Sequence, residues 1–130
     1  MPRRQVLTIP GIPHHQNPIP QGVRIGNMVY SSAVSGADAE NGNLPDDPAA
    51  QVRNTFRNVR LLVEAAGGTV ADIARMTVYL RDLDHRQFVN DAWLEMFPDE
   101  DDRPARHTQR ADIAARFHIQ IEFVAVLEAG

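Results

Sequence analysis

The sequence predicts one α+β domain over residues 1–130, in which a single β-sheet carries two helices on one of its faces. Three observations support this fold class. A tight-turn signal separates two short apolar runs, two longer segments repeat apolar residues at helical spacing, and three segments alternate apolar and polar residues. Their order along the chain is ββαβαββ. A chain of 130 residues is long enough to bury one core.

The N-terminal third is predicted to be extended and then to form a hairpin. Five prolines in residues 1–21 exclude a helix there and leave room only for short extended pieces. The apolar runs 23–25 and 28–32 flank Gly26-Asn27, which predicts a β-hairpin with a tight turn. Residues 38–47 contain Asn41-Gly42-Asn43 and are expected to form a loop.

The first helix is predicted over residues 48–66. Asp47 is a good N-cap, Pro48 suits the first helical position, and Gly67-Gly68 ends the helix. Its apolar residues form one face, which comprises Val52, Phe56, Val59, Leu62, Val63 and Ala66. Its other side carries solvated charges, which are Arg53, Arg57, Arg60 and Glu64. Residues 69–72 have the pattern of a capping box for a single turn.

The second half of the chain alternates strands with one more helix. Residues 73–81 read as a strand with Met76, Val78 and Leu80 on one face. A helix is predicted over residues 84–97 and ends before Pro98. Its inward residues are expected to be Phe88, Ala92, Trp93 and Met96. Two strands follow, at about residues 105–112 and 118–127.

The last predicted strand is apolar on both of its faces. Ile119, Ile121, Phe123 and Ala125 point one way, and Val124 and Val126 share the other face with His118, Gln120 and Glu122. Two helices on one side of the sheet leave that second face without a cover. We therefore predict a symmetric homo-oligomer whose sheets pack together, with any pocket at the seam between subunits.

Composition and charge exclude several classes of function. The formal net charge of −4 is not that of a general nucleic-acid binder, and no apolar run approaches the ~20 residues of a membrane span. The chain has no cysteine, and all 13 basic residues are arginine, so thiolate nucleophiles, disulfides and a lysine Schiff base are absent. The N-terminus lacks the apolar stretch of a signal peptide. These features predict a soluble cytoplasmic protein with no nucleic-acid or membrane partner.

A few polar residues remain as candidates for chemistry. Arg106 begins a strand near the expected seam, where a guanidinium binds a carboxylate through two parallel hydrogen bonds, although a surface or ion-paired arginine is the simpler interpretation. Gln120 and Glu122 on an apolar strand either join subunits or line a pocket. No pair of the five histidines has metal-ligand spacing, so we expect no metal. His107, His14 and His15 remain candidates for proton transfer.

Taken in order, the motifs of nearly the whole chain resemble those of one family, the Rid (YjgF-type) reactive-intermediate deaminases. The residues that carry the resemblance are Val23-Arg24-Ile25-Gly26-Asn27, Ser31-Ser32, Gln51, Asn58, Glu64-Ala65-Ala66-Gly67, Thr77-Val78-Tyr79-Leu80-Arg81-Asp82, Asn90, Pro104-Ala105-Arg106 and Ile121-Glu122-Phe123-Val124-Ala125. The resemblance implies a YjgF/chorismate-mutase-like fold, a homotrimeric barrel of sheets, and clefts between the subunits. It also implies cofactor-independent hydrolysis of enamines and imines to keto acids and ammonia.

The same resemblance assigns roles to single residues. The arginine that binds the substrate carboxylate corresponds to Arg106, and the hydroxyl of the hairpin to Ser32. Asn90 matches a recurrent asparagine beside the pocket, and Thr108 lies where many members have Cys or Thr.

Two positions depart from the family pattern and mark a divergent member. Ile19 replaces the pocket tyrosine, which makes the pocket more apolar and favours a larger or less polar substrate. Gln120 replaces the glutamate that often positions the attacking water. Glutamine holds a water by hydrogen bonds but accepts no proton as a base, so proton transfer would pass to Glu122 or to a histidine.

Three functions follow from these residues. The first is hydrolytic deamination of a small carboxylate-bearing enamine or imine, either a 2-imino acid or an amino-substituted unsaturated acid such as an aminomuconate. In it Arg106, Ser32, Asn90 and Thr108 bind the substrate and Gln120 places water. The alternative is a non-catalytic protein of the same fold that binds small carboxylates in the cleft between subunits. A third, ribonuclease activity, is disfavoured by the charge of −4 and by the lack of a basic, aromatic stripe.

Overall fold

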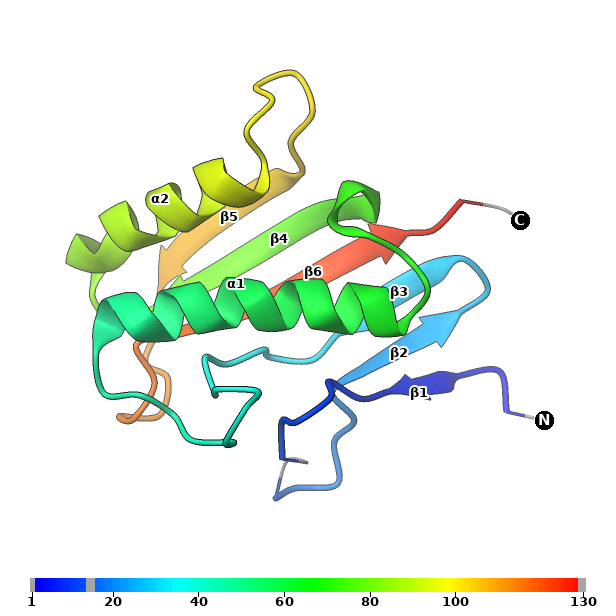
Figure 1. Cartoon of the computed structure of the whole chain (residues 1–130), viewed down its shortest axis with the longest axis horizontal. Coiled ribbons are helices and arrows are strands. Elements are labelled where there is room, and N and C mark those ends of the chain that lie inside the picture. Colours follow the sequence, from blue (N-terminus) through cyan, green and yellow to red (C-terminus); the bar gives the residue numbers. More distant parts are fainter. Residues whose placement is uncertain (1, 14–15, 129–130) are drawn as a thin grey trace.

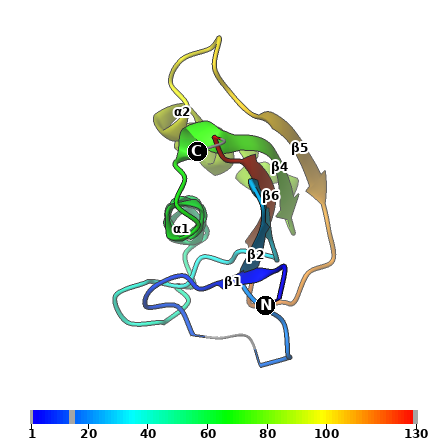
Figure 2. The ribbon, with the colours of Figure 1, turned by 90° about the vertical axis from the view of Figure 1, so that its right-hand side faces the viewer.

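The structure is a computed structural model that describes residues 2–13 and 16–128. One sheet, in the order β1-β2-β3-β6-β4-β5, carries α1 and α2 on the same face (Figures 1 and 2). The elements are β1 (Gln5–Leu7), β2 (Gly22–Ile25), β3 (Met28–Ser31), α1 (Pro48–Ala65), η1 (Val70–Asp72), β4 (Ile73–Leu80), η2 (Leu83–His85), α2 (Arg86–Met96), β5 (Ala105–Arg110) and β6 (Ile119–Val126). The predicted fold class is confirmed, and the proline-rich N-terminal stretch contributes one additional short strand, β1.

The predicted hairpin is formed by β2 and β3, whose register places Val23 opposite Tyr30. Gly26 has φ +58°, whereas no residue other than glycine has a positive φ in the described part of the chain. A positive φ at the first central position, filled by glycine, is typical of a type II′ turn. That turn matches the twist of the two strands, so the hairpin register is set locally.

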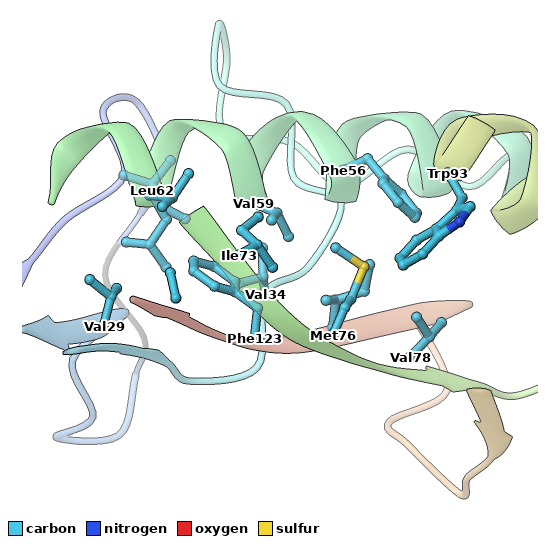
Figure 3. Close-up of a cluster of buried hydrophobic side chains, with 14 of the residues drawn as sticks. Val29, Val34, Phe56, Val59, Leu62, Ile73, Met76, Val78, Trp93 and Phe123 are labelled. Atoms are coloured by element: carbon cyan, nitrogen blue, oxygen red, sulfur yellow. The ribbon is translucent and has the colours of Figure 1, made fainter. Parts of the chain in front are cut away.

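The long helix α1 begins and ends where its caps predict. The side chain of Asp47 accepts a hydrogen bond from Ala50 N at 2.9 Å, and Gly67 follows the helix with φ +93°. All six apolar residues predicted for its inner face are buried against the sheet. Figure 3 shows the core that results, in which Phe56, Val59 and Leu62 of α1 lie over the strands. The amphipathic pattern therefore fixes which side of α1 the sheet covers.

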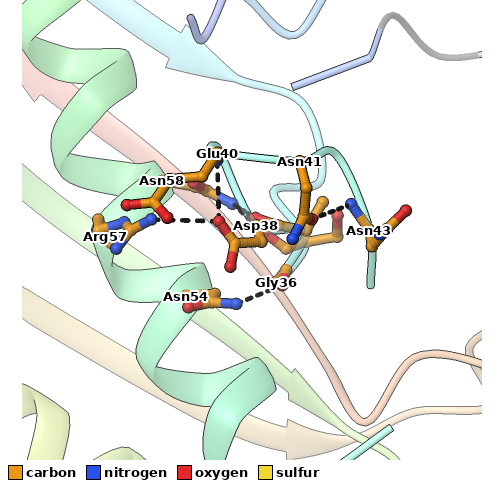
Figure 4. A network of polar contacts seen from close by, with 10 residues as sticks. Gly36, Asp38, Glu40, Asn41, Asn43, Asn54, Arg57 and Asn58 are labelled. Atoms are coloured by element: carbon orange, nitrogen blue, oxygen red, sulfur yellow. Dashed lines mark hydrogen bonds and ion pairs between the residues drawn. The ribbon is translucent and has the colours of Figure 1, made fainter. Parts of the chain in front are cut away.

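The loop before α1 is fastened to that helix by polar contacts (Figure 4). Gly36 lies so close that a Cβ placed there would be 2.3 Å from Gln51 O, which explains the glycine. Asn54 Nδ2 donates to Gly36 O at 3.1 Å, and Arg57 pairs with Asp38 at 3.5 Å. One of the arginines predicted to be solvated is thus engaged in an ion pair.

Helix α2 begins two residues later than predicted, because a short turn precedes it. The Asp82 side chain caps that turn by accepting a hydrogen bond from Asp84 N at 2.9 Å. Val89 and Trp93 are buried against the sheet. The expectation that Phe88 points inward is wrong: Phe88 is 36% exposed and its ring centroid lies 5.7 Å from that of His85.

The last strand of the chain, β6, lies in the middle of the sheet, antiparallel to β3 and β4. Its four alternate apolar residues are buried under the helices, as predicted. On the opposite face, Val124 is half-buried and Val126 is 41% exposed. Figure 2 shows that both helices lie on one side, so this face, here called the open face, is without a cover in the single chain.

Candidate active site

Arg106 lies on β5, which forms one edge of the sheet and runs parallel to β4. It is opposite Met76 in the register, so its side chain projects toward α2. Its Nη2 donates to Asn90 Oδ1 at 2.8 Å, and its guanidinium carbon lies 5.0 Å from the centroid of the Trp93 ring. A neutral amide and an aromatic face thus hold the guanidinium in one place.

The electrostatic environment of Arg106 is unusual for a half-buried cation. Burial lowers the pKa of Arg106, and the positive charge of the neighbouring Arg86 lowers it further. In residues 2–13 and 16–128, the two ion pairs are Arg57 with Asp38 and Arg81 with Asp112, so neither Arg106 nor Arg86 has a carboxylate partner. A guanidinium that is held in place but not neutralised is suited to bind an anion.

Thr108 lies beside Arg106 on the same side of β5. The register places Thr108 opposite the buried Val78, two residues after the Arg106–Met76 pair. Its Oγ1 is buried and has no hydrogen-bond partner in the described part of the chain. A buried hydroxyl without a hydrogen-bond partner, next to a guanidinium without a carboxylate partner, is suited to form a hydrogen bond with a ligand. His107, between the two, is exposed and projects to the open face.

A second polar group lies on the open face. Tyr79 OH donates to Glu122 Oε1 at 2.6 Å, and Gln120 lies opposite Tyr79 in the register. The hydrogen bond to Glu122 is the main reason why the pKa of Tyr79 is raised, followed by burial and by the charge of Glu122. A cavity of about 300 Å³ lies beside this pair, lined by Glu122, Thr77, Arg75, Tyr30, Ser31, Phe123 and Val124.

The remaining predicted site residues lie near β3. Ser32 follows this strand, and its hydroxyl donates to Pro20 O at 2.7 Å. Ile19 is 40% exposed. Because β3 and β5 are separated by β6 and β4, the end of β3 beside Ser32 is about 14 Å from the strand of Arg106, given three strand spacings. The remaining candidates, His14 and His15, lie outside the described residues.

The predicted site residues therefore fall into three groups within one protomer. Asn90, Arg106 and Thr108 come together beneath α2, Gln120 and Glu122 lie on the opposite side of the sheet, and Ser32 and Ile19 lie toward the other edge. Sequence reasoning missed two neighbours of Arg106. The sequence pattern predicts Trp93 only as a core residue and gives Arg86 no role, although both share a helix face with Asn90 at i+3 and i−4.

Other features of the described chain lie away from Arg106. A groove of about 390 Å³ runs between α1 and α2, lined by Arg53, Phe56, Arg57, Arg60, Val70, Ala92, Glu95 and Met96. In residues 2–13 and 16–128, no helix has the length and apolar character needed to cross a membrane. In the same residues, no three His, Cys, Asp or Glu side chains gather into a group suited to a metal ion.

The fold and the contacts of Arg106 together define a class of protein, namely small one-sheet α+β proteins with an open sheet face and a guanidinium fixed at the sheet edge. Residues 12–127 match the family model described as Endoribonuclease L-PSP. The chain therefore belongs to this family, which is the YjgF/Rid family that the sequence motifs resemble.

Relatives of known sequence and structure agree with this assignment. The 2-iminobutanoate/2-iminopropanoate deaminase of Escherichia coli K12 is 37% identical over 111 residues, which is 84% of this chain and 87% of that protein. The crystal structure of the E. coli YjgF gene product has a TM-score of 0.85, with 32% identity, and covers 95% of this chain and 99% of that one. The structure of E. coli TdcF with bound serine has a TM-score of 0.86, with 28% identity and coverages of 95% and 99%.

Proposed function

We propose that the protein is a cofactor-independent deaminase that hydrolyses a small enamine or imine carrying a carboxylate, and that it releases a keto acid and ammonia. The observation that carries the proposal is the half-buried Arg106, which Asn90 and Trp93 hold in place and which no carboxylate of the described chain neutralises. The names of its relatives as imine deaminases support the same chemistry.

In this proposal Arg106 binds the substrate carboxylate through paired N–H···O bonds, and Asn90 fixes the guanidinium. Binding the carboxylate places the adjacent C=N group beside Thr108, whose unpartnered Oγ1 orients the nitrogen. Ser32 comes from the second protomer of the cleft, since in its own protomer it is about three strand spacings away. Ile19 comes with it, because the Ser32 hydroxyl donates to the O atom of the adjoining Pro20.

The reaction needs one water and no strong base from the protein. The water oxygen forms a bond to the imine carbon, both water hydrogens end on the nitrogen, and the C–N bond breaks as the carbonyl forms. Because the imine nitrogen is itself the proton acceptor, Gln120 needs only to hold the water by hydrogen bonds. Gln120 lies on the opposite side of the sheet from Arg106 in its own protomer, so in this proposal the second protomer supplies it. Glu122 already accepts a hydrogen bond from the Tyr79 hydroxyl, so its nearer role is to orient that hydroxyl.

The same proposal includes a homotrimer with its active sites between subunits, in the cytoplasm. The open face of β6 supports self-association, because Val124 and Val126 lie on it without a cover in the single chain. The separation of the Arg106 group from Ser32 and Ile19 supports a cleft shared by two protomers. Neither nucleic acid nor membrane is a partner in this proposal.

The test is turnover of 2-iminobutanoate, generated in the assay by an amino-acid oxidase and followed through its capture by semicarbazide. The wild type should lower the captured imine, and Arg106→Ala should reduce kcat/KM by about 100-fold or more, because a charged hydrogen-bonded pair contributes several kcal/mol. Arg60→Gln, an exposed arginine on α1, is the matched control. Circular dichroism and light scattering verify that fold and assembly are retained.

Two outcomes would contradict this function. Full turnover by Arg106→Ala would remove the guanidinium from the mechanism.

The replacement of the family glutamate by Gln120 favours a second candidate function, that of a protein that binds small carboxylates without catalysis. Calorimetric binding of 2-oxobutanoate that depends on Arg106, without faster imine hydrolysis, would establish that alternative.

A further inference from the structure

The groove of about 390 Å³ between α1 and α2 lies on the helix side of the sheet, opposite the open face (Figure 2). Its floor is apolar. Phe56 of α1 is buried there, and Val70, Ala92 and Met96 are partly buried and pack against the core. Sites for small ligands usually have volumes of about 300–1,000 Å³. The groove is therefore large enough for a small molecule with an apolar body.

The wall that α1 contributes to this groove is positively charged. Three of the eight lining residues are arginines of α1, and one, Glu95 of α2, is acidic. Arg53 is exposed and makes no hydrogen bond or ion pair in the described part of the chain. Arg57 pairs with Asp38 at 3.5 Å (Figure 4), and Glu95 belongs to neither ion pair of the described chain. The groove thus carries excess positive charge in a chain of net charge −4, which suits an anion.

The direction of the two helices gives the groove two different ends. Helices α1 and α2 run the same way along the sheet (Figure 1). Arg53 lies in the second turn of α1, whereas Met96 is the last residue of α2 and Val70 begins η1, which follows α1. A cation without a partner therefore lies toward one end of the groove, and apolar side chains close the other.

We propose that this groove binds a small organic acid with an extended apolar body, of the class of medium-chain carboxylates. The acid group lies on Arg53, whose guanidinium donates N–H···O bonds to it. The apolar body lies over Phe56 and ends against Val70 and Met96, where its burial removes apolar surface from water. Such a ligand matches both the charge and the apolar floor of the groove.

This site is distinct from the candidate active site. Asn90 and Trp93 contact Arg106 from one face of α2, whereas Ala92 and Met96 of the same helix line the groove. The groove also lies away from the open face, so the proposed homotrimer leaves it accessible (Figure 2). The inference therefore goes beyond the proposed deaminase function and does not depend on it.

The test is a titration of the protein with octanoate and with 1-octanol, followed by NMR chemical shifts of the residues that line the groove. These shifts should saturate with octanoate. Octanol, which has the same chain without the charge, should bind about 5-fold more weakly, as expected for the loss of one exposed ion pair. Arg53→Gln should weaken octanoate binding by a similar factor and leave octanol binding unchanged. Ala92→Leu fills part of the apolar floor and should weaken the binding of both ligands.

The matched control is Arg4→Gln, since Arg4 is an exposed arginine that precedes β1. It should leave octanoate binding unchanged, and circular dichroism verifies that each variant is folded. The inference is overturned if octanoate causes no saturable shifts in the groove. It is also overturned if the shifts occur around Asn90 and Trp93 and Arg53→Gln does not reduce them, because the ligand then lies in the candidate active site. Binding of hexaglutamate that depends on Arg53, without binding of octanoate, would overturn it in favour of an acidic peptide.

Discussion

At the scale of single residues, Gln51 of α1 is fully buried although its side chain is polar. Its Nε2 donates to Pro45 O at 2.8 Å and to Arg116 O at 3.0 Å, and its Oε1 accepts from His118 N at 2.9 Å. One amide group thus satisfies three backbone groups from the two segments on either side of the helix. Gln51 therefore joins the loop before α1 to the segment that leads into β6.

Replacing this amide should cost stability more than a surface change does. Gln51→Ala leaves three backbone groups without partners and opens a cavity, so we expect the free energy of unfolding to fall by about 3 kcal/mol. Urea denaturation measures this loss. Gln87→Ala is the control, since Gln87 is exposed and bonds only the side chain of Asp91 among the described residues. A loss for Gln51→Ala as small as that of the control would show that the network contributes little.

The candidate site is partly predictable at this scale. Strand alternation puts Arg106 and Thr108 on one side of β5, and the family resemblance adds Asn90. The contact between Arg106 and Trp93 is not predictable, because it depends on how α2 packs across a strand that follows it in the chain. The effect of Arg86 on Arg106 is not predictable for the same reason. The helical spacing of Arg86 from Asn90 is visible in the sequence, but the action of its charge on Arg106 depends on the tertiary fold.

At the scale of elements, the pairing of β4 with β6 determines which polar residues meet on the open face. The register sets Tyr79 opposite Gln120 and Thr77 opposite Glu122, so the bonded Tyr79 and Glu122 are diagonal neighbours. Alternation in the sequence assigns each side chain to a face. It does not give the register between strands that are about forty residues apart, and this pair therefore appears only in the fold.

The Tyr79–Glu122 bond predicts a pH dependence of stability. The raised pKa of Tyr79 means that the folded state holds the phenol proton more tightly than the unfolded chain, whose tyrosine titrates near pH 10. The extra stability is present below pH 10 and is lost as the pH rises through the folded-state pKa.

This dependence can be measured by urea titration of the wild type and Tyr79→Phe from pH 7 to pH 11. The stability difference should be about 1 kcal/mol or less at neutral pH, since the pair is exposed, and should shrink above pH 10. Tyr30→Phe is the control, because no hydrogen bond of the Tyr30 hydroxyl appears among the described contacts. A difference between wild type and Tyr79→Phe that stays constant to pH 11 would contradict the linkage.

Most individual elements follow from local signals, whereas their arrangement does not. The hairpin turn and the caps of α1 are encoded by neighbouring residues, such as Gly26 and Asp47. The sheet order is not, since β6 comes last in the chain and yet lies between β3 and β4. Strand β1 also depends on a long-range partner, because it pairs with β2 across the proline-rich segment.

At the scale of the whole molecule, the open face of the sheet has two halves of different character. The half over β2, β3 and the end of β6 is apolar, with Val23, Tyr30, Val124 and Val126. The half over β4, β5 and the start of β6 is polar, with Thr77, Tyr79, His107, Gln109, Gln120 and Glu122. The apolar half is expected to be buried against another protein surface, and the polar half is suited to contact water and a polar ligand. One assembly that satisfies both is the proposed homotrimer.

The proposed assembly makes a prediction about Val124, which is half-buried at the centre of the apolar half. Light scattering should give the wild type three times the mass of the 14.5 kDa chain. Val124→Glu would place a charge in the seam, so we expect dissociation to protomers with helical circular dichroism retained, because the core on the other face is untouched. Imine turnover should fall by ~10-fold or more, since the cleft is then open to water. Leu94→Glu, on the helix side and 51% exposed, should leave the trimer intact; dissociation by Leu94→Glu instead of Val124→Glu would place the interface on the helices.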